Sequence, residues 1–420
     1  MTAAPDAALG VAWLGMRLAR DPARAARLAG GAEALWCAPT RRLACLIGLD
    51  AGAGRVAGER SAFRPAAARA ELDAMGVTAI ASTGPGAPRG LADLADPPPV
   101  LFARGPVASV LDALAGRPVV AVVGARRAGS AALAFTHALC GALARRGAVV
   151  VSGLALGVDA AAHEGALEAD GTTLAVLGGG VDDPTPRRNA ALARRMLDAG
   201  NVIVSEYWPG TPAAPWRFPA RNRIVAALAD AVVVVEAGAR SGALITADFA
   251  LELGRAVLAV PGAPWCASAR GCNELLRAGA ILCEGTDDVV AEVPTRAWSV
   301  DDPDGPSSAP GGEGDSTVVV ELARAPARAD ELADALGRTA ADIAAELAVL
   351  ELEGRVLRGE GQRYWAAPSL GRRRELSPPE PGSATSVADA RRIGPARARL
   401  APPRSGEGPP ARTTRPPPDA

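Results

Sequence analysis

Five glycine-, serine- or arginine-bearing segments follow short apolar runs in the middle of this 420-residue chain. Glycine lets a backbone come close to an anion, and the first N–H groups of a following helix point toward it. Arginines, here Arg126, Arg127 and Arg240, add cations that hold phosphate at two points. Such residues predict a phosphate-binding rim, although glycine-rich turns also occur without any ligand. The segments are Gly124–Arg127, Ser152–Asp159, Gly178–Gly180, Ser205–Tyr207 and Glu236–Gly242.

A further candidate is Tyr207–Arg223, which combines aromatic and cationic side chains. Arginines hold phosphates, and aromatic faces stack bases without regard to their sequence. Four prolines in this stretch favour an exposed loop, whose cations and rings suit the phosphates and bases of a nucleic acid. The alternative is a packed loop whose tryptophans fix it to the sheet. The side chains concerned are Tyr207, Trp208, Trp216, Arg217, Phe218, Arg221 and Arg223.

The elements that must position these segments alternate regularly between residues 118 and 282. Apolar runs of strand length are separated by stretches of helical length and pattern. This alternation predicts an α/β fold, a doubly wound parallel sheet in which ligands bind beyond the carboxyl ends of the strands. The expected strands are Val119–Val123, Ala148–Val151, Thr173–Leu177, Val202–Ser205, Ala231–Glu236, Ala256–Val260 and Ala280–Leu282, with Val77–Ala81 and Val100–Ala103 upstream. The expected helices are Ser130–Arg146, Asp159–Ala169, Arg188–Gly200, Asn222–Leu228 and Gly242–Gly254.

Composition divides the whole chain into five parts. In chain order we expect a small helical region, the α/β domain, a linker rich in proline and acids, a winged-helix-like module and a basic tail. The tail has too few large apolar residues to bury a core, so we expect it to be disordered. The expected bounds, in the same order, are 1–70, 76–290, 291–315, 316–367 and 368–420.

Residue usage excludes several classes of chemistry. All 45 basic residues are arginine, so the chain has no lysine for a Schiff base, a general base or a P-loop. Only His137 and His163 occur, which excludes a multi-histidine metal site. The six cysteines form no C-x-x-C pair and are expected to be reduced thiols. The first turn lacks G-x-G-x-x-G, which argues against NAD or FAD.

No constellation of hydrolytic or transfer residues is found, so we expect no enzymatic activity. His163 follows Asp159 by one helical turn, but a helix-capping Asp159 with a structural His163 is the stronger hypothesis. No uncharged run reaches the roughly 20 apolar residues that span a bilayer. No signal peptide is recognised, and we expect a soluble cytoplasmic protein without membrane partners.

Several motifs, taken in order, resemble the DNA-processing protein A (DprA, also called Smf) family. Val122–Arg126 resembles the family's G-S/A-R motif, and Ser152–His163 resembles S-G-x-A-x-G-I-D-x-x-A-H. Phe218–Ala226 is similar to F-P-x-R-N-R-I-I-A, and Ser241–Ala247 to S-G-S-L-I-T-A. The resemblance covers about residues 76–290 and extends more loosely through the winged-helix module.

The resemblance implies an extended Rossmann-like fold and a protein that needs no cofactor and usually dimerises. It also implies single-stranded DNA binding in natural transformation, with protection of incoming DNA and help in loading the recombinase RecA. Leu156 departs from the family, which often has a basic residue there, so one phosphate contact is in doubt. The candidate DNA-binding residues are Gly124, Arg126, Ser152, Gly153, Gly157, Phe218, Arg221, Asn222, Arg223, Arg240, Ser241 and Gly242.

An enzyme is the alternative hypothesis. Nucleoside-monophosphate phosphoribohydrolases of a related Rossmann group carry P-G-G-x-G-T-x-x-E after an equivalent strand. Here Glu236–Gly242 occupies that place without the glycine-threonine pair or the following glutamate. The glutamate that would act in hydrolysis is therefore missing. A nucleotide-binding enzyme of this group is the alternative hypothesis, and release of base from AMP tests it.

The winged-helix-like module departs from a duplex-binding pattern. Residues 316–367 contain nine acids and six arginines, a net charge of −3. The third expected helix begins at Ala340 after a capping Thr339, and it places Asp342 and Glu346 on one face. Phosphates would be repelled there, so we expect a protein-interaction or spacer module and a DNA site confined to residues 118–290.

Overall fold

The computed structural model describes residues 4–18, 20, 22–84, 86–293, 298, 316–324, 326–352, 355–358 and 362–366. The expected tail lies outside the described residues, and so does almost all of the expected linker.

A nine-stranded sheet forms the centre of the described chain, in the order β1-β2-β6-β5-β4-β3-β7-β8-β9. All neighbours from β6 to β9 in that order are parallel, whereas β2 pairs antiparallel with both β6 and β1. The predicted doubly wound sheet is therefore confirmed, with an antiparallel pair added at one edge. The strands are β1 (Val77–Ala81), β2 (Val100–Arg104), β3 (Val119–Val123), β4 (Val149–Ser152), β5 (Thr172–Leu177), β6 (Val202–Ser205), β7 (Ala231–Val234), β8 (Ala256–Ala259) and β9 (Ile281–Leu282).

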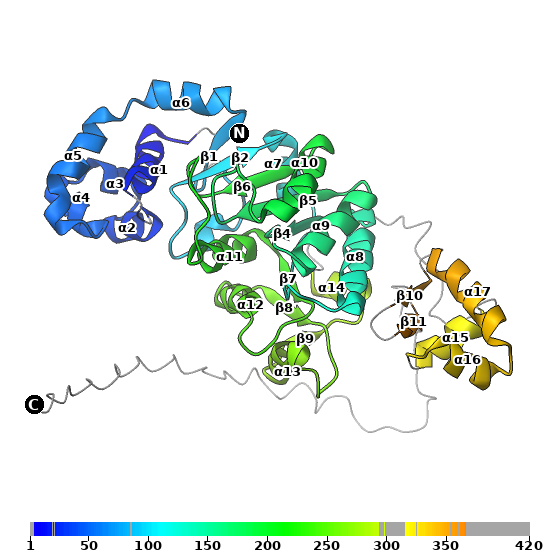
Figure 1. Cartoon of the computed structure of the whole chain (residues 1–420). Coiled ribbons are helices and arrows are strands. Elements are labelled where there is room, and N and C mark those ends of the chain that lie inside the picture. The colour runs from blue at the N-terminus through cyan, green and yellow to red at the C-terminus, as the bar shows by residue number, and fades with distance from the viewer. Residues whose placement is uncertain are drawn as a thin grey trace, which may run out of the picture. The chain divides into compact units, whose positions relative to one another are not determined.

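Helices cover both faces of this sheet, and Figure 1 shows α11 and α12 on the opposite side from α8 and α9. Along β3, Val119 and Ala121 pack toward one helical layer, while Val120 and Val122 pack toward the other. Burial on both sides explains why β3 is apolar at every position. One layer contains α7 (Val107–Gly116), α11 (Arg217–Leu228), α12 (Gly242–Glu252) and α13 (Arg270–Arg277). The other contains α8 (Ser130–Arg145), α9 (Val158–Glu168), α10 (Ala190–Asp198) and α14 (Thr286–Glu292).

The N-terminal helices pack against the antiparallel edge of the sheet through an aromatic cluster. Trp13 lies 5.5 Å from Trp208 between ring centroids, and Phe102 of β2 lies 5.2 Å from the same Trp208. Trp208 is only 2% exposed, so it is a core residue. The predicted helical character of this region is confirmed by α1 (Asp6–Leu18), α2 (Pro22–Ala29), α3 (Ala32–Cys37), α4 (Thr40–Leu46), α5 (Ala53–Ala62) and α6 (Pro65–Ala74).

The C-terminal module has the predicted winged-helix order and a core of its own (Figure 1). Leu332, Ile343 and Leu347 are fully buried in that core. Thr339 caps the third helix as expected, because its Oγ1 accepts a hydrogen bond from the Asp342 N–H at 3.2 Å. The elements are α15 (Thr317–Arg324), α16 (Ala329–Leu336), α17 (Ala340–Leu352), β10 (Val356–Arg358) and β11 (Tyr364–Ala366).

Candidate functional site

A pocket of about 310 Å³ opens beyond the carboxyl ends of β3, β4 and β7. Its walls are the turn after β3, the start of α11 and the start of α12. This is the edge of a parallel sheet at which ligands are expected. The candidate residues that line the pocket are Gly124, Arg126, Phe218, Arg221, Asn222, Ser241 and Gly242.

Arg126 and Phe218 form the exposed part of the pocket. The Arg126 guanidinium carbon lies 5.1 Å from the centroid of the Phe218 ring, and that of Arg221 lies 5.8 Å away. Both separations are within cation–π range. Arg126 is exposed and Phe218 is half-buried, so a cation and an aromatic ring lie side by side and are both accessible to a ligand.

Besides α11, the helices α12 and α9 begin beside the pocket and direct their positive dipole ends toward it. α12 starts at Gly242, and the Ser241 Oγ caps it by accepting a bond from the Ala243 N–H at 3.3 Å. α9 starts after Gly157, whose φ of 80° favours glycine. A Cβ at Gly157 would also collide with the carbonyl of Ala125, so glycine is required for the close approach of α9 to the Arg126 turn.

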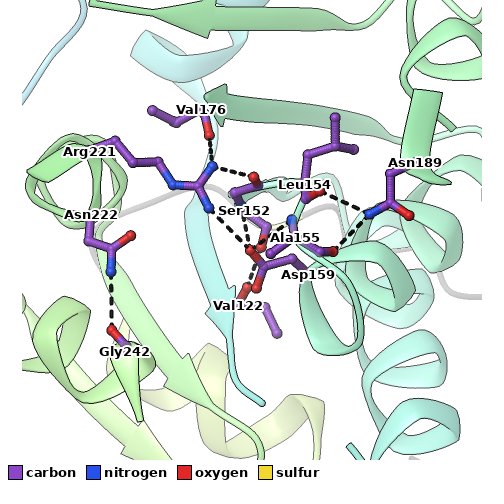
Figure 2. A network of polar contacts seen from close by, with 11 residues as sticks. Val122, Ser152, Leu154, Ala155, Asp159, Val176, Asn189, Arg221, Asn222 and Gly242 are labelled. Atoms are coloured by element: carbon purple, nitrogen blue, oxygen red, sulfur yellow. Dashed lines mark hydrogen bonds and ion pairs between the residues drawn. The ribbon is translucent and has the colours of Figure 1, made fainter. Parts of the chain in front are cut away.

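Arg221 is buried beneath the pocket instead of exposed on a loop. The residue is 4% exposed, and its Nη1 donates to the carbonyl oxygens of Gly153 and Val176. Its Nη2 lies 3.7 Å from a carboxylate oxygen of Asp159. Figure 2 shows the guanidinium between these groups. The expectation that Arg221 is exposed is therefore wrong.

Asp159 accepts backbone N–H groups of the segment Ser152–Asp159, which was expected to offer them to an external phosphate. One of its oxygens accepts the N–H groups of Gly153 at 3.2 Å and Ala155 at 3.3 Å. Ser152 is also buried, and its Oγ donates to the Val122 carbonyl at 2.7 Å (Figure 2). Burial raises the pKa of Asp159, and the Arg221 guanidinium opposes that rise. Burial lowers the pKa of Arg221 to about 10. The Asp159 carboxylate is thus buried beneath the pocket. It does not cap α9, so the expected helix-capping role of Asp159 is wrong.

Arg223 is also turned away from solvent. It makes a two-point ion pair with Glu206, at 2.8 and 2.7 Å, and lies 3.3 Å from Asp96. Arg223 is 4% exposed, and Arg217 is buried with its guanidinium 4.7 Å from the Tyr207 ring. The expected exposed loop is therefore wrong over most of Tyr207–Arg223.

The physical reason is the start of α11, five residues earlier than expected. Pro219 stands in the first helical turn, where its missing N–H has no intrahelical partner to lose. The prolines thus predicted a loop where a helix begins. Of the aromatic residues in the segment, Trp216 is 47% exposed and Phe218 is half-buried, whereas Tyr207 and Trp208 are buried.

The remaining candidates lie around the rim or join its walls. Asn222 follows Arg221 on α11 but points away from it, and its Nδ2 donates to the Gly242 carbonyl at 3.1 Å (Figure 2). This bond ties α11 to α12 across the pocket. Arg240 is exposed on the turn before Ser241 and does not line the pocket.

Asn189 was missed by sequence reasoning. It precedes α10, and its Nδ2 donates to the carbonyls of Leu154 at 2.9 Å and Ala155 at 3.0 Å (Figure 2). These bonds support the segment between β4 and α9 from the side opposite Arg221. A single asparagine with no motif around it gave no signal in the sequence.

His163 is structural. It is fully buried, and its Nδ1 lies 2.7 Å from the Thr173 Oγ1. Burial lowers the pKa of His163 to about 3, so the imidazole is neutral at physiological pH. Within the described residues no group of three or more His, Cys, Asp and Glu side chains could hold a metal ion. None of the described helices is long and apolar enough to cross a bilayer.

Comparison with known proteins finds family matches for the α/β domain and for the winged-helix module. The family described as DNA recombination-mediator protein A matches residues 79–294, and the DprA winged helix domain matches residues 302–362. A putative DNA processing protein DprA of Mycobacterium tuberculosis is 44% identical over 260 residues, which are 61% of this chain and 66% of that protein, just under two thirds of its length.

Two further relatives give a similar result. DNA processing protein DprA of Bacillus subtilis is 37% identical over 221 residues, covering 53% of this chain and 73% of that protein. The X-ray structure of DNA processing protein A from Streptococcus pneumoniae is 31% identical, with a TM-score of 0.56, and covers 69% of this chain and 99% of that chain.

Proposed function

Because the chain belongs to the DNA-processing protein A family, we propose that its sheet-edge pocket binds single-stranded DNA. The observation that carries this proposal is the stack of exposed Arg126 on the half-buried Phe218 ring at 5.1 Å. A cation suits the phosphate of a nucleotide and an aromatic face suits its base. The N-terminus of α12 adds its positive dipole end at the same place.

Single strands are favoured over duplex by the form of the site. Phe218 lies in a pocket between helix starts, so only an unstacked base can reach its ring. A base in a duplex is already stacked and paired. The pocket therefore supports recognition of an unpaired nucleotide without a preference for its sequence.

We assign different roles to the two sets of candidate residues. Those that contact DNA in this proposal are Gly124, Arg126, Gly157, Phe218, Asn222, Arg240, Ser241 and Gly242. Those that hold the site from beneath are Ser152, Gly153, Arg221 and Arg223, because each of them makes hydrogen bonds inside the protein.

The biological setting of the proposal rests on the family. We propose a cytoplasmic, dimeric protein that protects incoming DNA during natural transformation and helps to load RecA. Protection is measured by the survival of a labelled single strand in the presence of an exonuclease. Loading is measured by RecA filament formation on strands coated with single-strand-binding protein.

For the winged-helix module we propose a role other than contacting DNA. Glu346 of α17 is held by Arg338 at 2.5 Å, and Arg363 of the wing is held by Glu331 at 3.1 Å. Among the described residues of the module, Arg338 and Arg363 are therefore already paired with acids. A chain ending near residue 295 should keep its single-strand affinity at fixed salt. A loss of more than about tenfold in a chain of unchanged oligomeric state would contradict this role.

The proposed binding is tested by titrating single-stranded and duplex oligonucleotides across salt concentrations. We expect tighter binding of the single strand and a shallower salt dependence for Arg126→Ala, by about 0.7 in the logarithmic slope for one lost phosphate contact. Equal affinity for duplex, or an unchanged slope in Arg126→Ala, would contradict the proposal. Release of adenine from AMP by the same preparation would instead favour the enzyme hypothesis.

A further inference from the structure

Trp265 is the most exposed large apolar side chain in the described structure, at 86%. It lies on the loop that joins β8 to α13. Its ring makes no stacking contact with another aromatic ring or with a guanidinium among the described residues. Tryptophan is usually highly buried, so the fold gains little from this side chain where it stands.

The loop that carries Trp265 is held firmly at its two ends. The Gly262 N–H donates to the Asn273 Oδ1 at 3.2 Å, and the Asn273 Nδ2 donates to the Gly262 carbonyl at 2.9 Å. The Gly271 N–H donates to the Ala237 carbonyl at 2.7 Å. Pro264 also restricts the backbone just before the tryptophan. Trp265 is therefore presented to solvent by an anchored loop.

This loop lies on the same edge of the sheet as the pocket. β3, β7 and β8 are consecutive parallel neighbours, so the segments that follow them leave from one edge. Adjacent strands are about 4.8 Å apart, which puts the end of β8 roughly 10 Å along the edge from the end of β3. The turn between them carries the exposed Arg240.

The three features along this edge alternate between aromatic and cationic groups. Phe218 and Arg126 lie at the pocket, Arg240 lies on the next turn, and Trp265 lies on the one after. Such an alternation is typical of grooves that follow a single strand, with cations for the backbone and flat rings for the bases. An exposed ring on its own would not specify an occupant, but its place on the same sheet edge as the pocket favours the ligand of the pocket.

We propose that Trp265 is a second base-stacking residue, on which a single strand of DNA stacks after leaving the pocket and passing Arg240. This inference rests on the proposed function of the pocket and extends it to a strand longer than the pocket can hold. The ligand is a single-stranded polynucleotide of any sequence, because the indole face offers no hydrogen-bond pattern to read.

The test uses the full chain and two oligothymidylates, one of about 4 and one of about 16 nucleotides, the range of site sizes found for single-strand-binding folds. Trp265→Ala should weaken binding of the long strand by roughly 5- to 150-fold, as loss of one stacked base predicts. Binding of the short strand should be unchanged. Trp265→Phe should restore most of the affinity, and Leu28→Ala, at another exposed apolar residue, is the matched control.

Fluorescence supplies a second readout. The long strand should quench tryptophan emission of the wild-type protein more than that of Trp265→Phe, because an indole stacked on a base loses emission. The short strand should quench both proteins equally. Equal quenching of the two proteins by the long strand would overturn the proposal.

Three binding results also overturn it, and they differ from failure of the pocket. Trp265→Ala with wild-type affinity for the long strand shows that no base stacks there. An equal loss for both strands, or a loss that accompanies a lower sedimentation mass, shows that Trp265 acts through the pocket or through contacts between copies of the chain. When one of these three results is obtained and Arg126→Ala still weakens binding of both strands, the second site fails but the pocket stands. Absence of binding by the wild-type chain overturns both.

Discussion

Replacing Arg221 by methionine should destabilise the fold strongly, whereas the same change at Arg126 should weaken DNA binding and leave stability nearly unchanged. Arg221 is buried against Asp159 and two carbonyl oxygens, while Arg126 is exposed. Removing one partner of a buried ion pair costs roughly 3–5 kcal/mol, because the other charge stays buried. Each carbonyl left without a donor adds about 1–3 kcal/mol. The free energy of unfolding of a typical domain is only about 5–15 kcal/mol in total.

The measurement is the urea concentration at the midpoint of unfolding for each variant, monitored by far-ultraviolet circular dichroism. The dependence of the unfolding free energy on urea should have the same slope in all variants. Arg126→Met should remain within about 0.5 kcal/mol of the wild type, as surface substitutions usually do. If Arg221→Met does not fold, the double variant Asp159→Asn with Arg221→Met should recover part of the loss, because no charge is left buried. An Arg221→Met protein of wild-type stability that binds DNA as poorly as Arg126→Met would refute the reasoning, since Arg221 would then be a DNA contact.

Three other changes test the support beneath the pocket. Gly153→Ala should lower the melting temperature, measured by calorimetry, because the added Cβ would collide with the Arg221 guanidinium; an unchanged melting temperature would show that the guanidinium can move aside. Below pH 6.5 the unfolded chain protonates His163 while the folded chain, with a pKa of about 3, does not. The free energy of unfolding should therefore fall as pH decreases, by up to about 1.4 kcal/mol per pH unit. His163→Gln should reduce that fall, as measured by urea titrations at pH 6.5 and pH 5. An equal fall in the variant and the wild type would count against this role of His163. Arg223→Ala should destabilise the protein by leaving Glu206 buried without its two-point partner, yet keep the wild-type salt dependence of DNA binding; a shallower salt slope would return Arg223 to the contact surface.

The sheet could be predicted from sequence because its strands are apolar runs between strong turn signals. Val119–Val123 is a strand with the predicted bounds, and Val202–Ser205 is another. The start of α12 at Gly242 was likewise marked by a capping serine. Local chemistry determined these elements, so local reasoning was enough to find them.

The partners of the arginines could not be predicted in the same way. Arg221 meets Asp159 and the Gly153 carbonyl across more than 60 residues of chain, and only the crossing of α11 over the ends of β4 and β5 brings them together. A pattern of arginines and aromatic residues looks the same whether its cations face phosphate or internal carboxylates. The sequence therefore pointed to the sheet edge at which the pocket lies, but it could not separate the exposed Arg126 from the buried Arg221.

The aromatic cluster at the antiparallel edge sets the limits of the smallest fragment that can fold independently. The family match begins at residue 79 and includes Phe102 and Trp208. These two rings are covered by Trp13 and its helix α1, which precede the match. A fragment cut at the similarity boundary would expose these rings as a contiguous apolar patch, which favours aggregation in a soluble protein. Limited proteolysis of the native chain should therefore leave α1 attached to the sheet, and a fragment that begins at residue 79 should aggregate.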